Sequence, residues 1–106
     1  YSLEWIEARG GTRSELGTPL WDAVASFVEQ IEPEATLLPV CVAGFTDSHW
    51  LREAFGTVAY GFCPSRAMDP QLASRLIHSA NERIALDDLE LAVDCLRHTA
   101  VQVTGG

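Results

Sequence analysis

The spacing of apolar residues predicts a helix over about residues 19–31. Thr18 and Pro19 form a typical helix start, because threonine caps the first turn and proline loses no hydrogen bond at the first helical position. Pro33 cannot continue a helix and sets its end near residue 31. The apolar residues that recur three or four positions apart in this stretch are Leu20, Val24, Phe27, Val28 and Ile31.

Three further stretches carry helical signals. Residues 47–55 have apolar side chains on one side and are followed by Gly56, a residue suited to end a helix. One helical turn is predicted after Asp69-Pro70. A last helix is predicted to start at a capping box, Asp87-x-x-Glu90, and to run to about residue 103. Its apolar face is formed by Leu89, Val93, Leu96 and Ala100.

Three other segments read as strands, over residues 2–8, 36–43 and 57–63. The first and third alternate in side-chain character, and the second is a short apolar run in which Pro39 marks the start of the strand. Strands alternating with helices are typical of an α/β protein with layers around a mostly parallel sheet. We therefore expect an α/β fold.

Composition limits the size and the partners. The 106 residues allow one domain at most, and 47% hydrophobic against 21% charged residues predicts a folded core. A net charge of −8 argues against nucleic acids and anionic membranes as partners. All seven cationic residues are arginine, so neither a lysine-dependent phosphate loop at residues 10–14 nor Schiff-base catalysis is expected.

Cysteine content and hydropathy bear on location. Cys41, Cys63 and Cys95 are an odd set without C-x-x-C spacing, which favours buried thiols in a reducing compartment. No apolar run is long enough to span a bilayer, and the residues from Tyr1 onward lack the basic start of a signal peptide. The cytoplasm is the expected location.

Polar residues that could carry chemistry gather at residues 44–49 and 78–83. His78 could be a metal ligand or a hydrogen-bonded histidine without a metal, since zinc needs three or four ligands. Thr46 also reads as a helix cap, and His49 and Arg52 as one solvated helix face. Paired with His78, Cys63 could form a thiolate–imidazole couple or be inert packing.

Two strings change this picture. GFTDSHWLREAFGTVAYGFCP, followed after a loop by HSANERIALDDLELAV, resembles the C-terminal part of the di-zinc metallopeptidase family that includes acetylornithine deacetylase, succinyl-diaminopimelate desuccinylase, aminoacylase and glutamate carboxypeptidase. The resemblance is strongest over residues 43–64 and 76–93. It departs from the family pattern at Phe45 and Ser79, where glycine is common, and at His49, where some members have arginine.

The resemblance implies a fold, a metal centre and roles for six residues. Residues 1–9 would be the last strand of a lid domain that mediates dimerisation, and residues 10–106 the C-terminal part of the catalytic domain, a layered half-domain with a mostly parallel sheet. The full-length subunit would hold two zinc ions, with cobalt or manganese as alternatives. By the same resemblance, the metal ligand is His78, the substrate-binding residues are Thr46, Arg52 and His49, and the residues that fix the His78 loop are Asn81 and Glu82.

The leading hypothesis is therefore a zinc-dependent hydrolase of peptide or N-acyl amino acid amide bonds, of which this chain is an inactive C-terminal fragment. The remaining ligands and the general base would lie upstream in the family pattern. Homo-oligomers are expected, because a half-domain exposes edges and apolar faces. The rival hypotheses are a metal-free α/β assembly module and a thiol hydrolase based on Cys63 and His78.

Overall fold

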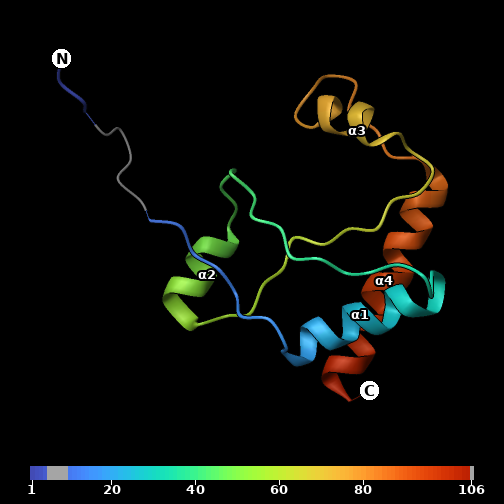
Figure 1. Cartoon of the computed structure of the whole chain (residues 1–106). Coiled ribbons are helices and arrows are strands. Elements are labelled where there is room, and N and C mark those ends of the chain that lie inside the picture. The colour runs from blue at the N-terminus through green and yellow to red at the C-terminus, as the bar shows by residue number, and fades with distance from the viewer. Residues whose placement is uncertain (5–9, 106) are drawn as a thin grey trace. The chain divides into compact units, whose positions relative to one another are not determined.

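The structure, a computed structural model, describes residues 1–4 and 10–105 and contains four helices in that part of the chain (Figure 1). They are α1 (Pro19–Ile31), α2 (Ser48–Phe55), α3 (Pro70–Leu76) and α4 (Leu86–Thr104). The chain divides into two compact units. One comprises Tyr1–Leu16 and Pro39–Tyr60 and contains α2, and the other comprises Gly17–Leu38 and Gly61–Gly106 and contains the remaining three helices.

The predicted α/β fold is wrong for the described residues, which contain no strand. The segments at 36–43 and 57–63 are irregular, and Val40 keeps 82% of its surface exposed. A strand exists only when its backbone groups pair with a neighbouring strand. Apolar, β-branched composition made these segments suitable for a sheet but supplied no pairing partner. Residues 5–8 of the predicted first strand lie outside the described residues.

Local signals explain α1. The Thr18 hydroxyl oxygen accepts a 3.2 Å hydrogen bond from the Trp21 backbone N–H, and Pro19 occupies the first helical position, as predicted. The helix ends at Ile31, two residues before Pro33. Its length and both ends confirm the helix expected from the sequence.

The short helices begin and end at capping residues. The residue after α2 is Gly56, whose φ of 64° lies in the left-handed region that glycine adopts without a Cβ clash. α3 begins after Asp69, whose carboxylate accepts a 2.8 Å hydrogen bond from the Leu72 N–H. The turn predicted after Asp69-Pro70 is thus a two-turn helix.

α4 differs from the prediction in its N-terminus. The cap residue is Ala85, which has no side-chain hydrogen bond to offer, so the predicted Asp87-x-x-Glu90 capping box is wrong. Asp87 and Asp88 nevertheless lie in the first turn, where the helix dipole favours negative charge. At the other end Gly105 adopts a φ of 70° and donates its N–H to the Val101 carbonyl at 3.1 Å.

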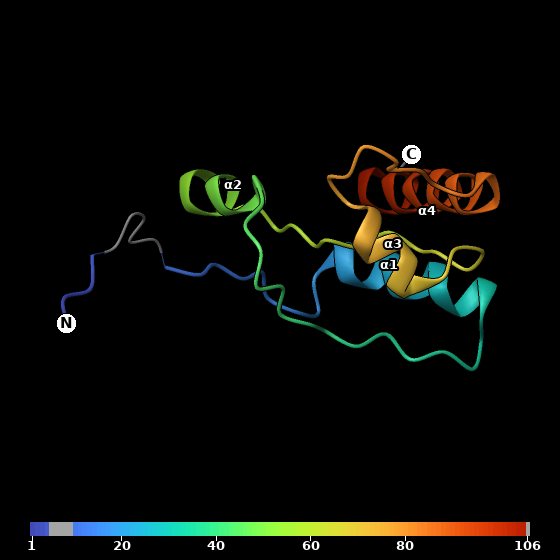
Figure 2. The ribbon, with the colours of Figure 1, turned by 90° about the horizontal axis from the view of Figure 1, so that it is seen from above.

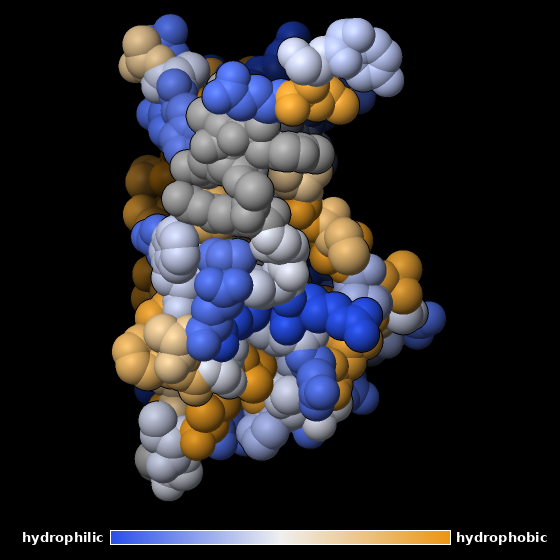
Figure 3. All heavy atoms as spheres, turned by 90° about the vertical axis from the view of Figure 1, so that its left-hand side faces the viewer, coloured by the Kyte–Doolittle hydropathy of each residue, from blue (hydrophilic) through white to orange (hydrophobic). Residues whose placement is uncertain are grey.

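α1 and α4 pack against each other within the second unit and form its core (Figure 2). The buried apolar side chains of the described residues are Ala23, Val24 and Phe27 of α1 and Cys95 of α4. The apolar face predicted for the last helix lies on the side of α4 away from α1. This face is exposed, since Leu96 keeps 70% of its surface accessible. Figure 3 shows one face of the molecule, on which hydrophobic residues lie among hydrophilic ones.

Candidate functional site

His78 lies in the connection between α3 and α4 and has an unusual backbone. Its φ of 61° is the one positive value at a non-glycine position among the described residues. The imidazole is exposed, and no hydrogen bond to it is found within the part of the chain that the structure describes. A left-handed conformation costs a residue with a Cβ about 1–2 kcal/mol, so surrounding contacts must hold it in place.

Two contacts hold the His78 turn. The His78 backbone N–H donates a 3.2 Å hydrogen bond to Oε2 of Glu82, and the Ser79 N–H donates to the Leu76 carbonyl at 2.9 Å. The Ser79 hydroxyl oxygen is buried and has no hydrogen-bond partner in the described residues. Asn81 takes part through its carbonyl oxygen, which accepts a 3.1 Å bond from the Arg83 guanidinium. The turn is thus held by one side-chain carboxylate and by backbone bonds, and no hydrogen bond from the described residues reaches the imidazole.

Arg52 is the centre of a hydrogen-bond cluster in the first unit. Its guanidinium donates from Nε to the Ser14 hydroxyl at 3.0 Å, from Nη1 to the Thr12 hydroxyl at 3.2 Å and from Nη2 to the Ala59 carbonyl at 2.6 Å. The Ala59 N–H in turn donates to the Ser14 hydroxyl at 2.9 Å, and that hydroxyl donates to the Ala59 carbonyl at 3.1 Å. All three guanidinium nitrogens therefore bind protein atoms.

His49 is the buried histidine of the same unit, with 6% of its surface exposed. Nδ1 lies 3.5 Å from the Thr12 hydroxyl and Nε2 lies 3.3 Å from a carboxylate oxygen of Glu53, one turn along α2. The aromatic rings of Phe45 and Trp50 each have their centroid 5.0 Å from that of the imidazole. The solvated face suggested for His49 and Arg52 is therefore wrong for His49, because rings and a carboxylate enclose it.

Thr46 lies directly before α2. Its carbonyl accepts a 3.0 Å hydrogen bond from the His49 N–H, and the residue is exposed. The N-cap of α2 is Asp47, which makes no side-chain capping bond. Thr46, His49 and Arg52 thus belong to the first unit, and His78, Asn81 and Glu82 to the second.

Among the described residues the most buried polar one is Asp88, which is 1% exposed and which no sequence motif indicated. Its carboxylate accepts hydrogen bonds from the backbone N–H groups of Arg66, Ala67 and Met68 at 2.6, 2.8 and 2.9 Å, and from the Ser65 hydroxyl at 3.0 Å. The bonds from Ala67 and Arg66, assisted by those from Met68 and Ser65, outweigh burial and lower the pKa of Asp88 from 3.8 to about 2. We call this arrangement the Asp88 clasp.

His98 also has a role that its position near a helix end did not reveal. Nε2 lies 2.8 Å from the Ser26 hydroxyl on α1, and the ring lies against Phe27 with centroids 5.6 Å apart. Because the Ser26 hydroxyl hydrogen can be donated to the Ala23 carbonyl at 3.0 Å, the serine oxygen can accept a bond from a protonated Nε2. His98 therefore joins the two core helices.

The cysteines differ from the prediction of buried thiols. Cys41 and Cys63 are exposed, and Cys95 alone is buried. Burial raises the pKa of the Cys95 thiol, which keeps it protonated and unreactive. All three are free thiols.

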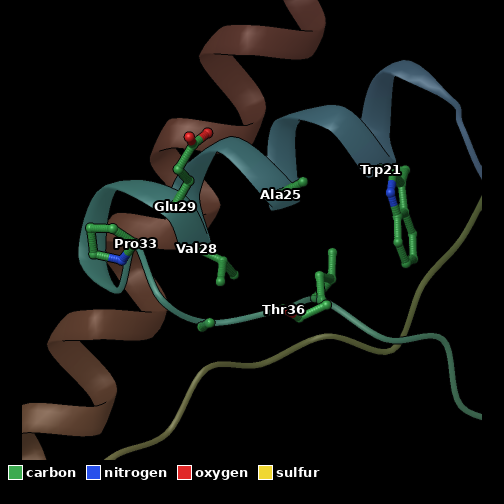
Figure 4. A pocket seen from close by; sticks show the side chains of 8 residues that line it. Trp21, Ala25, Val28, Glu29, Pro33 and Thr36 are labelled. Atoms are coloured by element: carbon green, nitrogen blue, oxygen red, sulfur yellow. The ribbon is translucent and has the colours of Figure 1, made fainter.

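Two open hollows adjoin α1. One, of about 350 Å³, lies between α1 and the segment after it, and Figure 4 shows Trp21 and Val28 pointing toward the stretch that carries Thr36. The other, of about 330 Å³, shares Val28 and Thr36 and extends toward Phe62 and Cys63. None of the six residues assigned to the site from the sequence lines either hollow.

The side chains that could bind a metal ion lie apart from one another in the described residues. Across residues 1–4 and 10–105, no three His, Cys, Asp or Glu side chains are grouped so that they could hold a metal ion. The exposed imidazole of His78 fits one position of a zinc site, and the other ligands would have to come from elsewhere. In the same residues no helix is both long enough and apolar enough to cross a bilayer.

Comparison with family models, with curated proteins and with solved structures found no match to the chain.

Proposed function

We propose that this chain is the C-terminal part of a zinc-dependent amidohydrolase that cleaves peptide or N-acyl amino acid amide bonds, with His78 as one metal ligand. One observation carries the proposal. His78 has an exposed imidazole and a left-handed backbone conformation, and its backbone N–H donates a hydrogen bond to the Glu82 carboxylate. A resemblance of sequence strings led to the same residue independently of this geometry.

The strained backbone supports a functional role for His78. Glycine would occupy a φ of 61° at no steric cost, yet the position carries a histidine. Residues held in such sparsely populated conformations cluster at active sites and ligand-binding positions. The conformation therefore favours a working imidazole over a merely tolerated one.

The surroundings of His78 suit a metal ligand whose partners in the coordination shell come from other polypeptide segments. The imidazole is exposed, and the adjacent Ser79 hydroxyl is a buried group whose hydrogen-bonding capacity is unused by the described residues. Bound zinc would polarise the amide carbonyl of a substrate. The part of His78 is to offer a neutral ring nitrogen, and that of Glu82 is to fix the direction of the turn.

The cluster around Arg52 would contribute in a different way. Since the guanidinium and the imidazole of His49 are both engaged by Thr12, we assign them the role of positioning the start of α2. Thr46 precedes that helix and is exposed, and the resemblance gives it a substrate-binding role.

The free thiols support a reducing location for the protein, which we take to be the cytoplasm. The proposed partners are a small peptide or N-acyl amino acid and further copies of the same protein.

Zinc content and hydrolysis of N-acyl amino acids by the full-length protein test the proposal. His78→Ala should remove stoichiometric zinc and activity together, whereas His98→Gln should retain the metal. Glu82→Gln should weaken zinc affinity about 10- to 100-fold, as expected for a residue that orients a ligand. Wild-type zinc content in His78→Ala would refute the assignment, and a metal-free wild-type protein would favour the assembly module instead.

A further inference from the structure

α4 presents an apolar seam that no described residue covers. Starting from Leu86, apolar residues follow one another at alternating intervals of three and four positions along α4. All of them are exposed. This is the spacing of the a and d positions of a coiled coil, maintained over the whole helix. The seam consists of Leu86, Leu89, Val93, Leu96, Ala100 and Val103.

The seam is distinct from the face that packs in the core. The buried residues of α4 are Asp88 and Cys95, which both fall at the c position of the same heptad. On a helical wheel the c position lies about 130° from the centre of the a/d seam, at about 100° of rotation per residue. α1 and the Asp88 clasp therefore occupy one side of α4 and leave the seam open.

The positions that flank the seam carry opposite charges. With Leu86 at a, the charged e positions are Glu90 and Arg97, the third e position is the uncharged Thr104, and the g positions are the uncharged Ala92 and Thr99. In an antiparallel pair of identical helices each e residue lies beside an e residue of the other helix. In a parallel pair an e residue would meet a g residue, and both charges would lack a partner.

We infer that α4 is a self-complementary interface through which two copies of this chain associate as an antiparallel pair. One register satisfies every position: Leu86 lies opposite Val103, Leu89 opposite Ala100 and Val93 opposite Leu96, each pair occurring twice about a two-fold axis. In the same register Glu90 of each copy lies beside Arg97 of the other. A second copy supplies both complementary charges at the required spacing, whereas a purely acidic or purely basic helix would complement only one, and a second copy is therefore the occupant that we propose.

The association is tested by sedimentation equilibrium of the intact protein from about 1 µM to about 1 mM, a range that spans tight and weak pairing. A monomer–dimer equilibrium is expected. Leu96→Glu should raise the dissociation constant more than about a hundredfold, because it buries a charge in the seam. Val101→Glu, at an exposed b position of the same helix, should change it about twofold at most. A protein that is monomeric throughout, or equal weakening by both variants, would overturn the inference.

A charge exchange tests the register and does not depend on apolar packing. Glu90→Arg and Arg97→Glu should each weaken the dimer about three- to tenfold, since each places like charges side by side. The double variant should regain wild-type association, because exchange restores both pairs in a two-fold symmetric dimer. Additive weakening in the double variant would contradict this register.

Disulfide trapping distinguishes the two orientations. In a background in which Cys41 and Cys63 are serine, Leu86→Cys mixed with Val103→Cys should cross-link, and Leu86→Cys alone should not. Self-linking of Leu86→Cys would indicate a parallel pair and contradict the proposal. Zinc plays no part in these readouts, so their outcome is separate from that of the His78 experiments.

Circular dichroism confirms that each variant keeps its helices. Loss of folding by Leu96→Glu in a monomer would show that the seam is covered within one chain.

Discussion

Asp88 in the first turn of α4 accepts a 2.6 Å hydrogen bond from the backbone N–H of Arg66, a residue that lies 22 positions earlier in the chain. The clasp of which this bond is part places one carboxylate against three successive N–H groups. Hydrogen bonds to an ionised acceptor are shorter and stronger than neutral ones. The clasp fixes the loop before α3 to the start of α4 through four hydrogen bonds.

The clasp should make stability depend on pH in a narrow acidic range. The pKa of Asp88 is about 2 in the folded protein, below its ordinary value of 3.8, so the folded state binds the proton less well than the unfolded state. The contribution is complete above about pH 4 and is lost as the pH falls toward 2. Urea unfolding between pH 6 and pH 2 measures it.

Asp88→Asn isolates that effect. The variant should be less stable than wild type at pH 6, and the difference between the two should shrink as the pH approaches 2. Asp94→Asn on the exposed side of α4 is the matched control and should follow wild type. A constant difference across the whole range would mean that Asp88 does not act through its charge.

Glycine at position 78 should stabilise the fold while removing the proposed ligand. His78→Gly relieves a left-handed backbone and should add about 1 kcal/mol to the free energy of unfolding. His78→Ala retains the Cβ and should gain nothing. Thermal melts of both variants make the comparison, and destabilisation by glycine relative to alanine would contradict the strained geometry.

Arginine at position 52 should not be replaceable by lysine. Arg52→Lys loses the planar arrangement that reaches Ser14, Thr12 and Ala59 together, at a cost of about 1–3 kcal/mol. Hydrogen exchange at the Ala59 amide should accelerate, since that N–H is held by the Ser14 hydroxyl. Arg75→Lys on exposed α3 is the control and should leave this amide unchanged.

The N-cap of α1 offers a local test of helix stability. Thr18→Ala removes the acceptor for the Trp21 N–H and should cost about 1 kcal/mol, whereas Thr18→Ser should retain most of it. Chemical denaturation followed by far-ultraviolet circular dichroism measures both. Equal stability of the alanine and serine variants would show that the hydroxyl does not cap the helix.

Truncation in the core should have the largest effect of these changes. Phe27→Ala opens a cavity between α1 and α4 and should cost about 3–5 kcal/mol. Phe55→Ala removes the same ring from an exposed position and should cost less than about 0.5 kcal/mol. Comparable losses from the two would mean that α1 and α4 do not form the core.

Helices were predictable because their signals are local. Thr18 with Pro19, Asp69 with Pro70, and Gly56 each act within one turn, so the sequence alone indicates where the helices begin or end. Strands have no such local signal. Whether residues 36–43 pair depends on another segment at the correct distance, and apolar composition does not supply one.

The contacts of the candidate site follow the same division. The bond from the His78 backbone N–H to the Glu82 carboxylate spans four residues and joins two residues that the sequence had singled out together. Arg52 and Ser14 lie 38 residues apart, and only the folded chain shows that the guanidinium is occupied. The sequence suggested a capping box at Asp87-x-x-Glu90, whereas the carboxylate that forms bonds is that of Asp88, and its partners lie about 20 residues earlier in the chain.

The clasp has a consequence for the segment that carries His78. Asp88 binds residues 65–68 to the start of α4. Residues 69–87 therefore form a loop whose two ends are joined by one carboxylate. The hydrogen bonds of the clasp, which lie outside the α1–α4 core, offset the entropic cost of closing that loop. Evolution could therefore lengthen, shorten or exchange the stretch, and with it the setting of the imidazole, without redesigning the core beneath.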